Sequence, residues 1–297
     1  MLFADSLIFC DLKPCTRSDG TRAVGMTLVL TEISRFGIAM AADSAVTITR
    51  EMLDGRPVTR VLTGVRKLQA IEKLDAGISV WGAGNIDGAD SDIWLDQFIR
   101  GRQNEYHSLK DFAILLQNEL RNHLPPIDAE NAPGGTIGFH LAGFVDSNGR
   151  KAPTFYHIHN GRSQKLEMRG EVVDGHMVNA NHDIPPEEGC MISDSGTVCV
   201  IHNGDYQIYK EVFDYLHNFF AELEEKTKGQ LLLPYSACLA DRVEWLRFQI
   251  ATISALYNFA GLRDAAREVV KLPTIGGPIT TLAISALDGH IESYATR

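Results

Sequence analysis

The run from Thr27 to Asp43 (TLVLTEISRFGIAMAAD) constrains the fold more than any other part of the sequence. Two apolar segments, 27–34 and 37–43, flank a short polar stretch at 34–37, a pattern that predicts two buried strands joined by a tight turn. An antiparallel hairpin brings the end of its second strand back beside the start of its first. We therefore expect Asp43 to lie next to Thr27, at one end of a buried sheet.

Apolar periodicity predicts how the rest of the chain is organised. We expect a hairpin over 47–62 that turns at Asp54-Gly55, strands at 67–71 and 77–81, helices at 89–103 and 109–123, strands at 136–145 and 154–158, short strands within 160–205, helices at 206–226 and 237–260, and a final strand at 279–287. This order of strands, two helices, strands, two helices and a strand is typical of an α+β fold with helices outside a pair of packed sheets.

The composition excludes several classes of protein. The formal net charge of −10 argues against a nucleic-acid partner or an anionic membrane surface. No apolar run reaches the roughly 18 residues that a membrane span requires. The five cysteines are odd in number and contain no CxxC pair, which indicates scattered reduced thiols. We expect a cytoplasmic protein that binds no nucleic acid or membrane and needs no cofactor.

Thr27, Asp43, Lys67 and Gly84 form a candidate catalytic group. Acyl transfer requires a nucleophile, a base, a charged group that tunes them, and a backbone N–H for the oxyanion. A threonine with a free α-amine carries nucleophile and base together, because the ordinary pKa of that amine, about 7.7–8.0, suits a base near neutral pH. A nearby lysine lowers the pKa of the amine by repulsion, and an aspartate holds the lysine. Gly84 lies in a small-residue loop, 82–88, whose amides can approach a ligand closely.

This arrangement resembles the proteasome β subunits and the related bacterial peptidase rings, which are N-terminal-nucleophile (Ntn) hydrolases. The resemblance is carried by TLVL from Thr27, by GIAMAADS over 37–44, by RKLQAI over 66–71, and by Ala83-Gly84 after an apolar strand. Asp43 lies 16 positions beyond Thr27, the separation that the family uses. The motifs match over 27–88, whereas from residue 136 onward the likeness is mainly one of element order.

The resemblance implies a four-layer αββα sandwich of two packed antiparallel sheets flanked by helices, formed by residues 27–297. It implies a threonine-type peptidase in which Thr27 attacks the amide carbonyl and Asp43 and Lys67 tune the base. The N–H of Gly84 would bind the oxyanion. It further implies a peptide or protein substrate and a homo-oligomer, for which a ring is the family's arrangement.

Several positions depart from the family pattern and indicate a divergent bacterial-type member. The family has an aspartate and a serine before a glycine pair, but this chain reads KLPTIGG over 271–277, where Thr274 can replace the serine and nothing replaces the aspartate. The family also has a second supporting serine in the loop before the third helix. Ser195-Gly196 is one candidate position for it, and the segment 202–205 is the other, which lies closer to the helix but contains no serine. The missing aspartate leaves a second hypothesis, a catalytically inactive assembly subunit.

Residues 1–26 show no apolar period and are expected to be a propeptide, a loose arm or an upstream translation extension. Met26 directly precedes Thr27, so initiation at Met26 and removal of the methionine would free the amine of Thr27. With residues 1–26 attached, the nitrogen of Thr27 is an amide and the general base is missing. We predict that the functional protein begins at Thr27 and that the 297-residue form is inactive.

The histidines form an alternative candidate site. His157 and His159 are two positions apart on a predicted strand and share a face. Together with His140 and His182 they could be a metal site, but no Cys, Asp or Glu completes the spacing. Solvated or hydrogen-bonded histidines, and no bound metal, are therefore expected.

Overall fold

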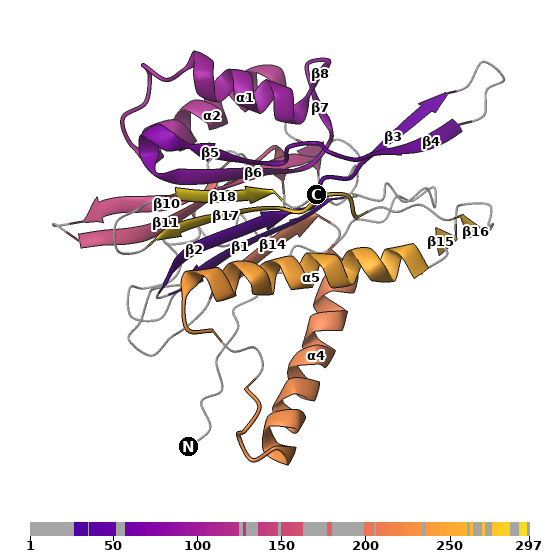
Figure 1. The fold of residues 1–297 in the computed structure, drawn as a ribbon. Coiled ribbons are helices and arrows are strands. Elements are labelled where there is room, and N and C mark those ends of the chain that lie inside the picture. The colour runs from indigo at the N-terminus through magenta and orange to yellow at the C-terminus, as the bar shows by residue number, and fades with distance from the viewer. Residues whose placement is uncertain are drawn as a thin grey trace.

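The computed structural model describes residues 27–34, 36–51, 57–124, 127–128, 136–147, 150–162, 177–179, 199–204, 206–232, 236–259, 262–263, 269–270, 275–285 and 291–295. Within these residues, two five-stranded antiparallel sheets pack face to face, and helices cover the outer face of each sheet (Figure 1).

The first sheet is built around the predicted strand pair. Its strands in spatial order are β14 (Cys199–Gly204), β1 (Leu28–Ser34), β2 (Gly37–Ala42), β17 (Thr280–Ser285) and β18 (Ile291–Ala295). Every residue of β1 and β2 is buried, because one face of the sheet packs on the second sheet and the other face packs on helices. Val29 pairs with Ala42, so Asp43 returns beside Leu28 at the start of β1.

The second sheet carries the other predicted strand pairs. Its strands in spatial order are β13 (Met177–Asn179), β11 (Arg150–His159), β10 (Ile137–Ser147), β6 (Ala76–Gly82) and β5 (Leu68–Ile71). Leu68 pairs with Ser79, and the N–H of Val80 donates to the carbonyl of Lys67 at 2.8 Å. Lys67 therefore stands beside the carboxyl end of β6.

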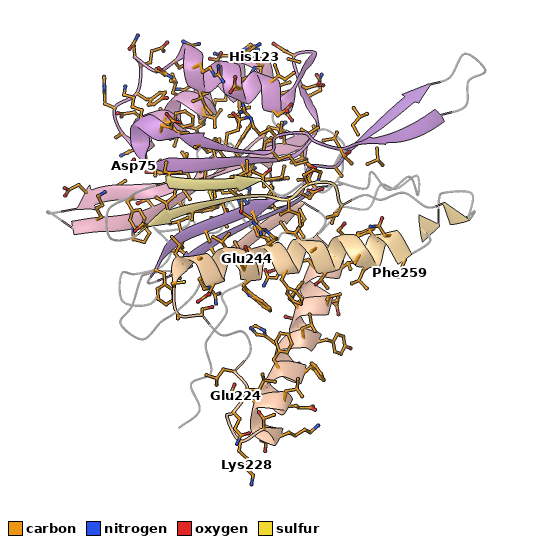
Figure 2. All side chains as sticks on the ribbon, in the orientation of Figure 1. Asp75, His123, Glu224, Lys228, Glu244 and Phe259 are labelled. Atoms are coloured by element: carbon orange, nitrogen blue, oxygen red, sulfur yellow. The ribbon has the colours of Figure 1, made fainter. Side chains whose placement is uncertain are left out.

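In the described part of the chain, four helices form the two outer layers. They are α1 (Ser91–Gly101) and α2 (Leu109–His123) on the second sheet, and α4 (Tyr206–Lys226) and α5 (Leu239–Phe259) on the side of the first sheet. As predicted, α2 starts at Ser108, whose hydroxyl accepts from the N–H of Asp111 at 3.1 Å. The far half of α4 extends away from the body of the molecule (Figure 1), with Glu224 and Lys228 at its tip (Figure 2).

Three apolar cores separate the four layers. One lies between α1, α2 and the second sheet, one between the two sheets, and one between the first sheet and α4 and α5. The predicted α+β class, with two packed antiparallel sheets and outer helices, is confirmed.

Smaller elements surround this sandwich. The predicted hairpin is present as β3 (Val46–Glu51) and β4 (Pro57–Leu62) and projects from the body (Figure 1), with its Asp54-Gly55 turn outside the described residues. Short strands that the sequence did not predict are β7 (Asn85–Ile86), β8 (Ala89–Asp90), β9 (Ile127–Asp128), β15 (Leu262–Arg263) and β16 (Val269–Val270), and β18 follows the strand that was expected to be the last. The short strand β12 (Gly161–Arg162) lies in the segment 160–205, where short strands were expected. None of the helices in the described part of the chain has the length and apolarity that a membrane span requires.

Candidate active site

A buried ion pair joins the two sheets near the start of β1. Asp43 directly follows β2 in the first sheet, and Lys67 directly precedes β5 in the second. Lys67 Nζ donates to Asp43 Oδ1 at 2.9 Å and also to the carbonyl oxygen of Ala45. The side chains of Lys67 and Asp43 are only 2% and 0% exposed. The structure thus brings two of the four predicted site residues into direct contact.

Burial changes the acidity of this lysine. It lowers the pKa of Lys67 below the ordinary value, because a buried ammonium loses its hydration, and the charge and hydrogen bond of Asp43 offset only part of this effect. The ammonium is therefore a better proton donor than a surface lysine. It is also a fixed positive charge for any group that lies beside it.

Asp43 also collects backbone N–H groups from three segments. Oδ1 accepts from the N–H of Leu28 at 2.9 Å, and Oδ2 accepts from the N–H groups of Ala45 at 3.0 Å and Gly276 at 3.2 Å. The carboxylate thereby fixes the start of β1, the end of β2 and the segment before β17 at one point. These backbone contacts could not be read from side-chain patterns, although Gly276 belongs to the glycine pair that the sequence singled out.

Thr27 is the residue that precedes this fixed point. It is 5% exposed, and the next residue, Leu28, pairs with Gly204 of β14. Gly204 has a φ of 102°, and a Cβ there would lie 1.6 Å from the carbonyl oxygen of Thr27. Only glycine allows this close approach. Gly204 falls in one of the two segments considered for a supporting serine; the other, at Ser195-Gly196, lies outside the described residues.

Gly84 lies in the turn between β6 and β7. Its carbonyl accepts from the N–H of Ser91, the first residue of α1, at 3.0 Å. A Cβ at Gly84 would lie 3.1 Å from Cγ1 of Val46. Val46 follows Ala45, whose carbonyl binds Lys67. Gly84 therefore lies against Val46, the residue next to the Ala45 carbonyl that binds Lys67.

A second buried polar group, between the sheets, contains three of the histidines. His140 Nε2 lies 2.5 Å from Oδ1 of Asn203, and its Nδ1 lies 3.0 Å from the hydroxyl of Thr31. Because an amide oxygen only accepts, Nε2 carries the proton and Nδ1 accepts from Thr31. The ring of His157 is 5.3 Å from that of His140 and 4.7 Å from that of His159.

These histidines are buried, so the expectation of solvated side chains is wrong, while the alternative of a hydrogen-bonded histidine describes His140. Burial lowers the pKa of His140 to about 4, with the nearby His202 acting in the same direction and the bond to Asn203 opposing it. Burial also holds the pKa of His157 well below its usual value.

Other expected positions can be placed only in part. Within the described ranges no group of three or more His, Cys, Asp and Glu side chains is arranged to hold a metal ion. His182, Thr274 and residues 1–26 lie outside the described residues.

No family model matches the sequence, and no curated protein matches it. Among solved structures, the chain is similar to Anbu (ancestral beta-subunit) from Yersinia bercovieri, with a TM-score of 0.48 and 14% sequence identity. The match covers 91% of this chain and 86% of that chain. The chemical reading of the site therefore depends on the geometry of its own residues.

Proposed function

We propose that the chain is an N-terminal-threonine hydrolase that cleaves amide bonds, as a threonine-type peptidase does. One observation carries the proposal: Asp43, which is paired with the buried Lys67, accepts from the N–H of Leu28, one residue from Thr27. A buried ion pair is weak evidence for stability, because the loss of hydration offsets the attraction of the charges. A role in tuning the pKa of the α-amine of Thr27 explains why the pair lies beside that residue.

In the proposed reaction, Thr27 Oγ1 attacks the carbonyl carbon of the substrate, and the hydroxyl proton passes to the α-amine of the same residue. The N–H of Gly84 stabilises the oxyanion. The intermediate collapses when that proton is transferred to the leaving nitrogen, and an ester remains on Thr27. A water molecule, activated by the amine, then hydrolyses the ester and restores the hydroxyl.

Lys67 and Asp43 act on the amine of Thr27 in this scheme. The ammonium of Lys67 lowers the pKa of the α-amine by repulsion, so that the neutral, basic form is present near pH 7. Asp43 holds the ammonium in place and fixes the start of β1. The reaction therefore requires neither a metal nor a cofactor.

The base exists only if the amine of Thr27 is free. We propose that initiation at Met26 and removal of the methionine free it, so that the form with residues 1–26 attached is inactive. Intact-mass measurement of the protein expressed from its own gene tests this start. A mature species that keeps residues 1–26 and still hydrolyses peptides would refute both the start and the amine-base mechanism.

A hydroxyl-directed covalent inhibitor tests the nucleophile. The chain that starts at Thr27 should form one adduct, which peptide mapping places on Thr27, and the 297-residue chain should form none. Thr27→Ser should keep the adduct and Thr27→Ala should lose it, because serine retains the nucleophilic hydroxyl and alanine does not. Absence of an adduct in protein shown to start at Thr27 would overturn the proposal.

The surface of α4 and α5 favours a second candidate, an inactive subunit of a homo-oligomer. Large apolar side chains are exposed there, including Tyr215 at 74%, Phe219 at 52% and Phe259 at 87%. Exposed apolar patches often mark contact surfaces. Light scattering on the parent and on Thr27→Ala separates the two functions. Normal assembly of both, without turnover by the parent, favours the inactive subunit, and a monomeric parent excludes it.

A further inference from the structure

One histidine ties the turn after Gly84 to the end of α2. His123 is the last residue of that helix and lies in the outer helical layer (Figure 2). Its Nδ1 contacts Oδ2 of Asp87, and its Nε2 lies 3.3 Å from Oε1 of Glu119. Asp87 belongs to the turn between β7 and β8, three residues after Gly84. The contact therefore connects the Gly84 segment to a helix that is firmly packed on the second sheet.

The chemistry of the two partners requires a charged imidazole. Carboxylate oxygens only accept hydrogen bonds, and a neutral imidazole has a single N–H to donate. Both contacts of His123 can therefore be made only by the imidazolium. The C-terminal end of a helix, where His123 stands, also favours a positive charge.

The charged groups around His123 come from three elements. Asp87 comes from the β7–β8 turn and Glu119 from α2 itself, while Arg102 at the end of α1 contacts Oε2 of Glu119 at 3.1 Å. The rings of Trp94 in α1 and His123 are nearly perpendicular, and their centroids lie 6.3 Å apart. Because Glu119 is shared with Arg102, the charge of His123 acts mainly on Asp87.

The start of the turn is held by the bond from the N–H of Ser91 to the carbonyl of Gly84 at 3.0 Å and by the buried side chain of Ile86, whereas its tip at Asp87 and Gly88 is exposed. Asp87 has a φ of 51°, a left-handed backbone conformation that residues other than glycine seldom adopt. The strands on either side are two residues long each. Within the turn, the N–H of Gly88 donates to the side-chain oxygen of Asn85 at 2.8 Å. A contact to Asp87 from outside the turn therefore acts on this exposed tip.

We infer that charged His123 is a positioning residue that holds the exposed tip of the turn over 84–88, and through the turn the N–H of Gly84, and that loss of its proton loosens the tip. The inference rests on the proposed role of Gly84 as oxyanion donor. His123 touches neither the substrate nor the nucleophile in this scheme.

The direction of the pH effect follows from the contacts of His123. Partial burial lowers its pKa, but the hydrogen bonds and charges of Asp87 and Glu119 outweigh this effect, so the pKa lies above the usual value. A raised pKa means that the contact is complete below the ordinary histidine pKa of about 6.5. The contact is lost as the pH rises through the raised value.

Hydrogen exchange of the 297-residue chain tests the contact without any activity. The peptide over 83–90 is followed at pH 5.5 and 8.5, and rates are corrected for intrinsic exchange. Protection should fall by about fivefold between these values, the size expected of a partly exposed ion pair at a helix C-terminus. His123→Gln should be poorly protected at both pH values. His107→Gln, an exposed histidine before α2, should behave like the parent. Parent-like protection in His123→Gln would overturn the inference.

Kinetics on the chain that starts at Thr27 separates this inference from the proposed function. His123→Gln should lower kcat by up to about fivefold with little change in KM, and it should remove the alkaline limb of the pH profile of kcat. An active parent with an unchanged profile in His123→Gln would overturn the inference. A parent without turnover that still shows the exchange result would overturn the proposed function and leave the contact of His123 with the turn supported.

Discussion

The layer between the two sheets contains two chemically different regions. The apolar region, formed by Ile33, Ile38, Met40, Phe155 and Leu282, consists of buried hydrocarbon side chains and one thioether. The histidine region, formed by Thr31, Ser79, His140, His157, His159 and Asn203, is equally buried but polar. The two regions meet where the rings of His140 and Phe155 lie 5.1 Å apart.

The difference follows the position of the candidate site. Asn203 of the histidine region directly precedes Gly204, whose backbone packs against the carbonyl oxygen of Thr27. The ion pair of Asp43 and Lys67 binds the next residue, Leu28. Polar contacts have directional geometry, whereas apolar packing tolerates many side chains of similar volume. The polar contacts fix the start of β1, and the apolar region supplies cohesion.

The largest expected effect comes from removing the carboxylate of Asp43, which holds the buried ammonium of Lys67. Asp43→Ala should lower the free energy of unfolding by about 4 kcal/mol, because it leaves the ammonium of Lys67 buried without its partner. Denaturant titration measures the loss. The double variant Asp43→Ala/Lys67→Met should lose less than the sum of the two single variants, because it buries no unpaired charge. Additive losses would mean that the pair does not interact energetically.

The apolar region should respond to loss of volume. Leu282→Ala should lower the free energy of unfolding by about 3 kcal/mol, because Leu282 is 1% exposed and its removal leaves a cavity. Leu62→Ala, at a position that is 48% exposed, is the control and should change stability by less than about 0.5 kcal/mol. A small effect at Leu282 would show that the neighbouring side chains collapse into the space.

Acid should affect the histidine region and spare the apolar one. The pKa of His140 falls from about 6.5 in the unfolded chain to about 4 in the folded chain, so the unfolded state binds the proton first. His140 alone should therefore lower the free energy of unfolding by about 2–3 kcal/mol as the pH drops from 6.5 to 4.

Parallel titrations of the parent and of His140→Gln isolate this contribution, because both share the remaining carboxylates. The loss between pH 6.5 and 4 should be smaller in the variant by about the amount assigned to His140. Identical pH dependence of the two proteins would contradict the assignment.

The sequence predicts the apolar region better than the polar one. Every residue of β1 and β2 is buried, and the apolar residues that run through both segments predict the two strands. The contact of Asp43 with Lys67 was also expected, because the candidate catalytic group requires an aspartate that holds the lysine. The cross-sheet bond of His140 to Asn203 joins residues 63 positions apart and depends on how the two sheets lie on each other, which no local pattern encodes.

The same limit applies to the helices and turns. The predicted helix over 206–226 has apolar residues at a helical period, but they are covered unequally: Tyr209 and Phe213 are buried, whereas Phe219, in the far half of α4, is 52% exposed. Periodicity reports which face is apolar and not whether anything covers it. The contact of Asp87 with His123 likewise could not be predicted from the sequence, because it joins a turn to the end of a distant helix.

The smallest expected effect separates two hydroxyl groups of the histidine region. Among the described residues, Ser79 Oγ is buried without a hydrogen-bond partner, so Ser79→Ala should be neutral or stabilise the protein by up to about 1 kcal/mol. The hydroxyl of Thr31, in contrast, bonds Nδ1 of His140, and Thr31→Val should cost about 1–2 kcal/mol because it leaves that nitrogen unsatisfied. Denaturant titration of both variants at pH 7 makes the comparison. A cost for Ser79→Ala equal to that of Thr31→Val would mean that Ser79 has a partner in solution. An ordered water molecule is the group of the right size, and the histidine region would then be hydrated as well as polar.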